Sequence, residues 1–208
     1  MKKLFSLTLM FLLVCGTAYA IVPVYNDIWD ISQGAVVDSS SSIHYGSDAR
    51  NMFGGGYGWI ESGNTLFDDF RPAGYTHYIE WHTPSMVDLT GFNLFAASDG
   101  GSNARSFQEF RLYYKNGLNW MRFYTFDPTH PYGAGPQNNE LALAVNGLSI
   151  NAEYFRAEFD QYGYVDWASG PRIYELDGFS QAPVPEPGSL WMLGTGLLGL
   201  LGLRRKNR

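Results

Sequence analysis

The sequence predicts an all-β protein, an antiparallel jelly-roll sandwich of two sheets. Apolar and polar residues alternate in segment after segment of the chain, with the period of two that is typical of half-buried strands. Turn residues separate these segments, and no long amphipathic helical stripe interrupts them between Ile21 and Pro183. Repeated strands without intervening helices favour two packed antiparallel sheets.

The first clear strand covers residues 77–82, where Ile79 and Trp81 share one face and Tyr78, Glu80 and His82 share the other. Three further segments alternate in the same way, and their expected inward residues are Phe92, Leu94 and Ala96, then Phe110, Leu112 and Tyr114, then Phe155, Ala157 and Phe159. His77 and His82 point to opposite faces, so they cannot bind one metal ion together.

Other segments leave more than one interpretation open. Residues 120–126 are aromatic on both faces, so their core face is undecided. Residues 140–145 fit either a short helix or another strand. Asn116-Gly117 is a pair that favours a hairpin turn.

Charge is distributed unevenly along the 208 residues. Six of the 14 basic residues lie at the two ends, so residues 21–183 hold eight basic and 19 acidic residues. Phosphate binding needs clustered Lys and Arg, and an acidic body therefore excludes a nucleic-acid-binding protein. This body has the size of one domain.

Residues 1–20 have the pattern of a secretory signal peptide. Lys2 and Lys3 precede an apolar run, and Ala18 and Ala20 occupy the two positions that a signal peptidase reads. Cys15 ends a lipobox-like sequence, but Val14 is bulky where a small residue is required, so cleavage after Ala20 is favoured. Because Cys15 is the only cysteine, the mature body has no disulfide, cysteine-ligated zinc or cysteine nucleophile.

The C-terminal segment, residues 184–208, has three parts in a fixed order. Pro185-Glu186-Pro187 comes first, the apolar residues 190–203 follow, and Arg204, Arg205 and Lys206 begin a basic tail. Fourteen helical residues reach only about 21 Å, short of a hydrocarbon core of ~30 Å. The basic tail should remain in the cytoplasm, with the body outside.

This tripartite tail resembles the PEP-CTERM sorting signal of exopolysaccharide-producing Gram-negative bacteria. The resemblance implies export through the Sec translocon and processing by an exosortase, with the apolar helix only transiently in the inner membrane. The expected final location is the cell surface or the extracellular matrix of a biofilm. A plain membrane anchor after a proline linker is the alternative.

The order of the expected strands gives the sequence a second family resemblance, which covers roughly residues 49–179. Its pieces are residues 64–67, 78–81, 87–92, 105–107, 110–114, 157–159 and 170–176. This order is similar to discoidin, or coagulation-factor C-type, domains of the galactose-binding-like superfamily. The resemblance implies a jelly roll that binds carbohydrate, lipid headgroups or protein through loops at one end.

Many sugar-binding members of that family hold a structural calcium, and the resemblance carries over to Glu175 as a ligand in the final strand. The early loop departs from the family pattern, because Gly54 stands where an Asp is usual. Calcium would then need Asp48, Asn51, Asn64 or backbone carbonyls, since one Glu falls far short of six to eight oxygens. A loop held by hydrogen bonds without metal is the alternative.

Aromatic residues in loop-like stretches are the best candidates for sugar binding. Sugar rings stack on flat side chains while their hydroxyls form hydrogen bonds. The candidates are Trp59 and Trp167 first, then Tyr57, Tyr132 and Arg105. If these rings fill the core instead, the binding hypothesis fails.

The sequence therefore favours an exported lectin-like module that binds exopolysaccharide. One alternative is a structural or protein-adhesion component without a sugar site. A weaker one is a polysaccharide-active enzyme, which would need a carboxylate pair such as Asp68-Asp69, Glu158 with Asp160, or Glu175 with Asp177. No catalytic residue is expected.

Overall fold

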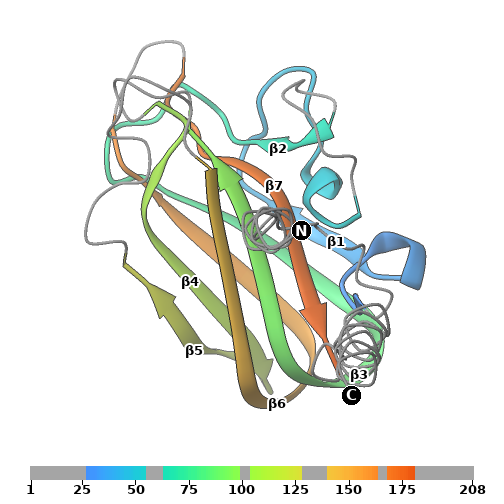
Figure 1. Ribbon diagram of the computed structural model, residues 1–208. Coiled ribbons are helices and arrows are strands. Elements are labelled where there is room, and N and C mark those ends of the chain that lie inside the picture. Colours follow the sequence, from blue (N-terminus) through green and yellow to red (C-terminus); the bar gives the residue numbers. More distant parts are fainter. Residues whose placement is uncertain (1–26, 55–62, 99–103, 128–139, 164–167, 181–208) are drawn as a thin grey trace, which may run out of the picture.

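The computed structural model describes residues 27–54, 63–98, 104–127, 140–163 and 168–180 (Figure 1). The predicted signal peptide and the sorting segment, with the helices expected in them, lie outside these residues. The described elements, in chain order, are the 3-10 helix η1 (Ile31–Gln33), β1 (Val36–Ser40), the 3-10 helix η2 (Ala49–Met52), β2 (Thr65–Leu66), β3 (Thr76–Ala97), β4 (Phe107–Asn116), β5 (Asn119–Phe126), β6 (Glu140–Gln161) and β7 (Arg172–Phe179).

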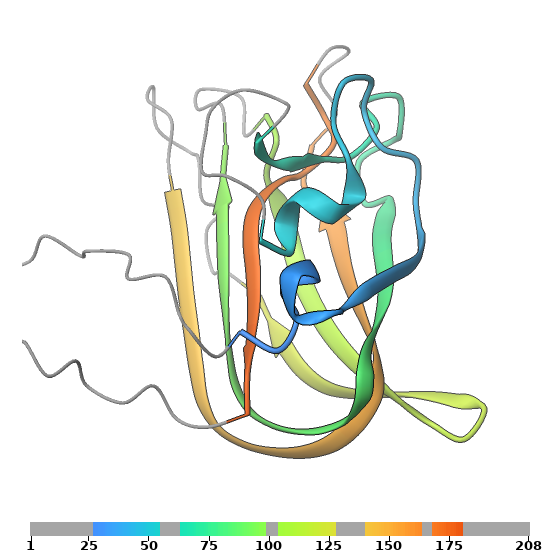
Figure 2. The same cartoon turned by 90° about the vertical axis from the view of Figure 1, so that its right-hand side faces the viewer.

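The strands pair antiparallel in the order β2-β7-β3-β6-β4-β5, and β1 pairs with β3. β3 and β6 are 22 residues long, and both double back at one end of the molecule (Figure 2). Each therefore contributes to both layers of the sandwich. The first half of β3 and the second half of β6 lie with β1, β4 and β5, while their other halves lie with β7. The predicted antiparallel sandwich is confirmed.

The bend of these long strands is marked by two shifts in the β3–β6 register, between His82 and Val87 and between Leu89 and Gly91. A Cβ at Gly91 would lie 2.5 Å from the carbonyl oxygen of Val145, so only glycine allows this backbone approach. Such bulges change which residues face inward without ending the pairing. For this reason, segments that look separate in the sequence, residues 77–82 and 92–96, belong to one strand.

The core between the layers is largely aromatic. The rings of Trp29 and Trp81 meet edge to face at 5.0 Å, and Phe110 stacks on Phe159 at 5.1 Å. The inward faces predicted for β3, β4 and β6 are confirmed by burial; the residues concerned are Ile79, Trp81, Phe92, Leu94, Ala96, Phe110, Leu112, Phe155, Ala157 and Phe159. Tyr114 is only partly buried.

The undecided segments are both strands. β5 ends the sheet order, and its residues are exposed or half-buried. Residues 140–145 begin β6. The hairpin between β4 and β5 differs in detail from the expected Asn-Gly turn. Asn116 pairs with Asn119, and Gly117 takes the first turn position with a φ of +60°, the position where glycine favours a type II′ turn.

Candidate functional site

Segments that flank several predicted loops converge at the end of the sandwich opposite the bend. Ala97, which ends β3, pairs with both Glu140 and Arg172, the first residues of β6 and β7. The backbone N–H of Arg105 donates to the carbonyl of Ala168 at 3.0 Å. Loops at one end of a rigid sandwich are well placed to form a binding site.

The aromatic candidates Tyr57, Trp59, Tyr132 and Trp167 lie outside the described residues. Their role as ligand-binding residues remains a prediction.

Arg105 has a different position from the one expected for a ligand-binding residue. Only 5% of it is exposed, and its guanidinium pairs with the buried carboxylate of Asp69. Asp69 also accepts hydrogen bonds from the backbone N–H groups of Ser169 and Gly170, at 3.1 and 3.2 Å. Arg105 therefore ties together the segments that carry the loops, and its buried charge is used inside the protein.

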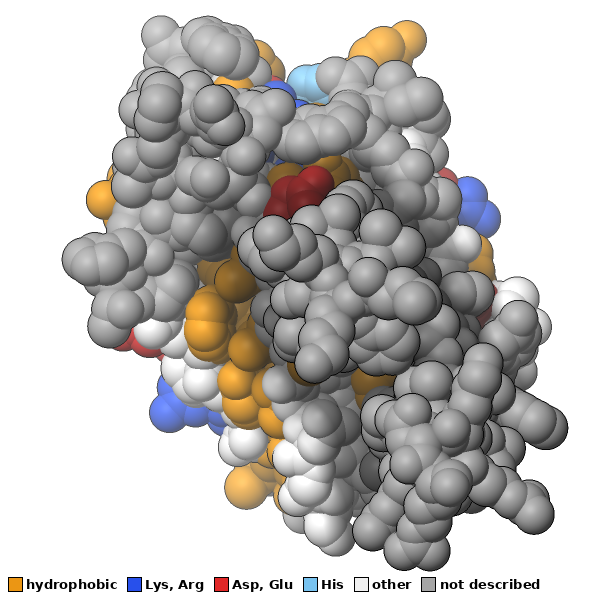
Figure 3. Space-filling model, viewed as in Figure 1, with side chains coloured by type: hydrophobic (Ala, Val, Ile, Leu, Met, Phe, Trp, Pro, Cys, Tyr) orange, Lys and Arg blue, Asp and Glu red, His pale blue; other side chains and the backbone are white. Residues whose placement is uncertain are grey.

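Three carboxylates, two of them on β7, form what we call the acidic cluster. Asp27, Glu175 and Asp177 each offer an oxygen within 4.8 Å of the others. Figure 3 shows acidic side chains recessed in the surface in the region of β7. Asp27 precedes η1 in sequence, so the cluster joins the beginning of the described chain to its final strand.

Backbone N–H groups hold two of these carboxylates in place. One oxygen of Asp27 accepts from the N–H groups of Trp29 and Gly178, at 3.0 and 2.7 Å. Glu175 Oε1 accepts from the N–H of Gly54 at 3.0 Å. The carboxylates are thus oriented by three segments that lie far apart in the sequence.

The electrostatics of the acidic cluster are unfavourable for three ionised groups. Burial raises the pKa of Asp27 to about 8, and the negative charge of Asp177 adds to the effect. Burial likewise raises the pKa of Glu175 and that of Asp177. Among the described residues, no Lys or Arg forms an ion pair with any of the three. A bound cation would supply the missing positive charge.

Position 54 does not have room for the acid that the family pattern would place there. Its φ is +87°, and a Cβ there would lie 2.6 Å from the carboxylate of Asp30. The space that a side chain at position 54 would need is therefore filled by an acid from the preceding segment. Asp27 and Asp30 could not be identified from the sequence, because nothing in their local pattern distinguishes them from other loop acids. Asp177 was noticed only as one of a carboxylate pair.

Asp48, the second metal ligand that the sequence suggested, is not part of the acidic cluster. It caps η2, and its carboxylate accepts from Arg50 Nη2 at 2.6 Å and Nε at 3.0 Å. The hydrogen bond from Arg50 lowers the pKa of Asp48. A carboxylate that already has its own cation close by is a poor partner for a metal ion.

The acidic cluster could supply part of the ligand set of a calcium ion. Ca²⁺ binds six to eight oxygens, and carboxylates are its preferred charged ligands. Asp27, Glu175 and Asp177 would hold the ion, whose charge would link the chain before η1 to β7.

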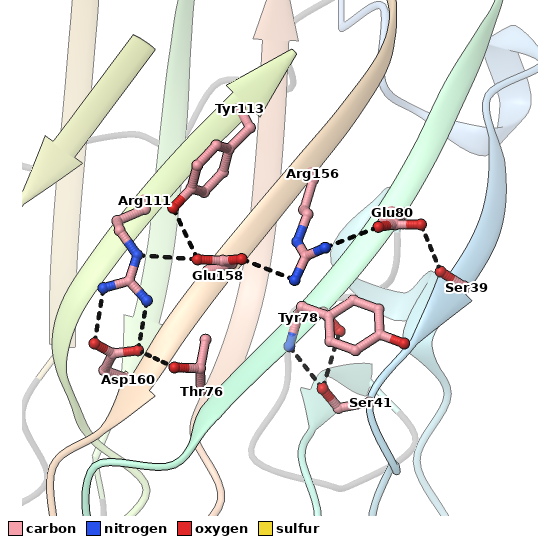
Figure 4. Close-up of polar contacts among 10 residues, drawn as sticks. All are labelled: Ser39, Ser41, Thr76, Tyr78, Glu80, Arg111, Tyr113, Arg156, Glu158 and Asp160. Carbon is pink, nitrogen blue, oxygen red and sulfur yellow. Dashed lines mark hydrogen bonds and ion pairs between the residues drawn. The ribbon is translucent and has the colours of Figure 1, made fainter. Parts of the chain in front are cut away.

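A second group of charges lies on the outer face of β3, β6 and β4, and we call it the ion-pair ladder (Figure 4). It runs in alternating sign through Glu80, Arg156, Glu158, Arg111 and Asp160, with contacts of 2.7 to 3.1 Å. Glu158 and Asp160 were one of the carboxylate pairs considered for catalysis. Here both are paired with arginine, as expected of structural groups.

Comparison with protein families identifies the C-terminal segment. Residues 183–206 match the PEP-CTERM protein-sorting motif, and the match includes Pro185-Glu186-Pro187 and the start of the basic tail. The chain thus carries the signal of an exported protein that an exosortase sorts. No curated protein sequence matches the chain. Within the described residues, no helix has the length and apolar character needed to cross a membrane.

Solved structures of low sequence identity share the fold. A family 32 carbohydrate-binding module from a family 31 glycoside hydrolase of Clostridium perfringens is 15% identical, with a TM-score of 0.52, covering 73% of this chain and 94% of the module. The family 32 module of NanJ from C. perfringens, solved with galactose, is 10% identical, with a TM-score of 0.50, covering 74% and 98%.

An enzyme has a similar fold as well. Allantoicase from Saccharomyces cerevisiae is 13% identical, with a TM-score of 0.52, and the match covers 74% of this chain but only 43% of the enzyme. The fold alone thus does not separate binding modules from enzymes. The class that emerges is an exported protein, sorted through its PEP-CTERM motif, with a fold like that of family 32 carbohydrate-binding modules.

Proposed function

We propose that this protein is a lectin-like module that binds exopolysaccharide at the cell surface or in the extracellular matrix. The main support is the loop end of the sandwich, where the segments that flank several loops are fixed by hydrogen bonds and by the Arg105–Asp69 pair. A similar fold in the NanJ module was solved with galactose. In our proposal, Trp59 and Trp167 stack on sugar rings, and Tyr57 and Tyr132 add hydrogen bonds.

Calcium has a supporting role in this proposal. Held by Asp27, Glu175 and Asp177, it would fix the chain before η1 and the Gly54 turn against β7. Gly54 immediately precedes the segment that contains Tyr57 and Trp59. Ordering this turn in advance would reduce the entropy lost when the glycan binds.

Export and sorting set where this binding takes place. The Sec translocon would carry the chain across the inner membrane, and the apolar helix would hold it there transiently. Exosortase processing would then deliver the body outward. Deleting Arg204–Arg208 should disturb sorting because the basic stop is lost, and normal surface delivery of the truncated chain would contradict this.

Replacing Trp59 and Trp167 by Ala tests the loop site. We expect the affinity of the full chain, purified in non-ionic detergent, for exopolysaccharide to fall by about tenfold or more, with an unchanged thermal unfolding midpoint. Leu118→Ala is the matched control, because Leu118 is 94% exposed and lies at the far end of β4 from the loops. Unchanged binding in the tryptophan variants would overturn the proposal and favour protein adhesion. A lower unfolding midpoint would place the rings in the core and also contradict it.

A further inference from the structure

The outer face of the sheet carries a second unusual feature, close to the bend and away from the loop end. In successive strands, Trp120 of β5 pairs with Lys115 of β4, and Tyr154 of β6 pairs with His82 of β3. Lys115 also approaches Tyr154, so the four side chains form one continuous line across the sheet. We call this line the aromatic–cationic row.

Direct contacts hold the row together. Lys115 Nζ lies 5.8 Å from the ring centroid of Trp120 and 5.3 Å from that of Tyr154. The Tyr154 and His82 rings are 5.3 Å apart, and His82 Nδ1 lies 2.9 Å from Asp38 Oδ1. These cation–π and ring contacts fix the side chains on an open surface, where Tyr154 is 38% exposed.

His82 of this row pairs with the carboxylate of Asp38, but the ammonium of Lys115 does not have such a partner among the described residues. Among the described residues, neither Lys115 nor its neighbour Arg122 forms an ion pair with a carboxylate, and both are exposed. Arg122 pairs in register with Tyr113, on the same face. The adjacent ion-pair ladder differs, because each of its arginines contacts at least two carboxylates (Figure 4). Lys115 and Arg122 therefore leave positive charge on this part of an otherwise acidic body.

The chemistry of the row fits a negatively charged sugar polymer. An ammonium and a guanidinium donate charge-assisted hydrogen bonds to carboxylates, and phenol and indole groups donate to sugar hydroxyls. At a strand spacing of about 4.8 Å, the row from Trp120 to His82 spans about 14 Å, which is long enough to contact more than one sugar. We propose that this row is a second binding surface, and that it takes acidic polysaccharides such as polyuronates.

The acidic end of the same face would limit where such a polymer lies. Glu109, Glu158 and Asp160 surround Arg111 farther along β4 and β6, and this excess of carboxylates repels an anionic chain. The polymer is therefore confined to the part of the face near the bend. This surface does not depend on the loop site, and a polymer that reached both would bind with higher avidity.

The test uses the full chain in non-ionic detergent, with polygalacturonate as the acidic probe and a neutral galactan for comparison. We expect the Lys115→Ala and Arg122→Ala substitutions together to weaken polygalacturonate binding by about tenfold, and high ionic strength to weaken the wild type similarly. Binding of neutral galactan through the loop site should be unchanged. Tyr154→Phe should weaken polygalacturonate binding less, because it removes only the hydroxyl.

Arg50→Ala is the control, because it removes one positive charge from η2, far from the row in sequence and outside the sheet. It should leave polygalacturonate binding unchanged. Lys115→Ala alone, which also removes one positive charge, is compared with it. If Arg50→Ala weakens binding as much as Lys115→Ala, the interaction reflects overall charge and the row is not a site. Absence of wild-type binding to polygalacturonate would also overturn the proposal, whereas loss of galactan binding alone would count only against the loop site. Thermal unfolding of each variant confirms that the fold is intact.

Discussion

The acidic cluster and the ion-pair ladder use the same kinds of side chain in opposite ways. In the ladder, Arg111 and Arg156 separate the carboxylates of Glu80, Glu158 and Asp160, so that neighbouring charges attract. In the cluster, Asp27, Glu175 and Asp177 meet without an arginine or lysine partner among the described residues. Burial then raises their pKa values.

This difference shows which of the two charged groups needs bound protons or a cation to offset its charge. The ladder is complete in itself, and the interactions among strands β3, β6 and β4 explain its presence. The cluster is costly at neutral pH unless protons or a cation offset its negative charge. A group of this kind, placed beside a predicted binding loop, is the better candidate for a functional role.

The largest expected difference between the acidic cluster and the ion-pair ladder is in how calcium changes the free energy of unfolding. At a free calcium concentration a thousandfold above its dissociation constant, the free energy of unfolding should rise by about 4 kcal/mol. Urea unfolding of the wild type with calcium and with chelator measures this. Asp177→Asn should greatly reduce the effect, while Glu80→Gln, in the ladder, should leave it intact. Equal calcium responses in the two variants would argue against the cluster as the metal site.

Breaking the ladder should have the next largest effect. Arg111→Ala leaves Glu109, Glu158 and Asp160 facing one another without their shared cation, and we expect a loss of about 2 kcal/mol in the free energy of unfolding. Urea unfolding measures this loss. The calcium response of this variant should match that of the wild type. A variant as stable as the wild type would show that the ladder is not a structural element.

The effect of these raised pKa values on the pH dependence of folding stability should be visible only without calcium. The folded pKa of Asp27 is about 8, against 3.8 for an ordinary Asp, and that of Glu175 is also raised. The folded protein therefore binds more protons, and this stabilisation, complete below about pH 4, is lost as the pH rises toward 8. Thermal unfolding between about pH 5 and pH 8 should show a falling midpoint in chelator, and Asp27→Asn should flatten the curve. A midpoint that rises with pH would contradict the raised pKa values.

Asp48→Asn should have the smallest effect. Its exposed pairing with Arg50 lies outside the acidic cluster, and asparagine still caps a helix well. We expect the calcium-dependent shift in unfolding midpoint to equal that of the wild type. A reduced shift would return Asp48 to the list of metal ligands.

Much of the fold was predictable because burial imposes a period of two on each strand. Ile79 with Trp81 and Phe155 with Phe159 were assigned to the core from alternation alone, and the structure buries all four. The continuity of β3 could not be predicted, because its bulges shift the alternation near Val87 and Gly91. The local pattern there looks like the end of one strand and the start of another.

The candidate site was less predictable, since it depends on contacts between distant segments. Glu175 came from a family resemblance, but its partner Asp27 lies at the other end of the body and has no distinguishing local pattern. Asp48 was expected to serve as a metal ligand, but it pairs with Arg50 and lies outside the acidic cluster. Arg105 was expected to face a ligand, but the long-range contact with Asp69 buries it.

The central claim is that the loop end binds a glycan and that calcium at the acidic cluster supports this binding. The most direct measurement is a titration of the purified protein against the exopolysaccharide of its own host, first with calcium and then with chelator. We predict saturable binding that weakens strongly on chelation while the protein remains folded. Absence of binding in both conditions, with a folded protein, would contradict the lectin function, and equal binding in both would contradict the role of calcium.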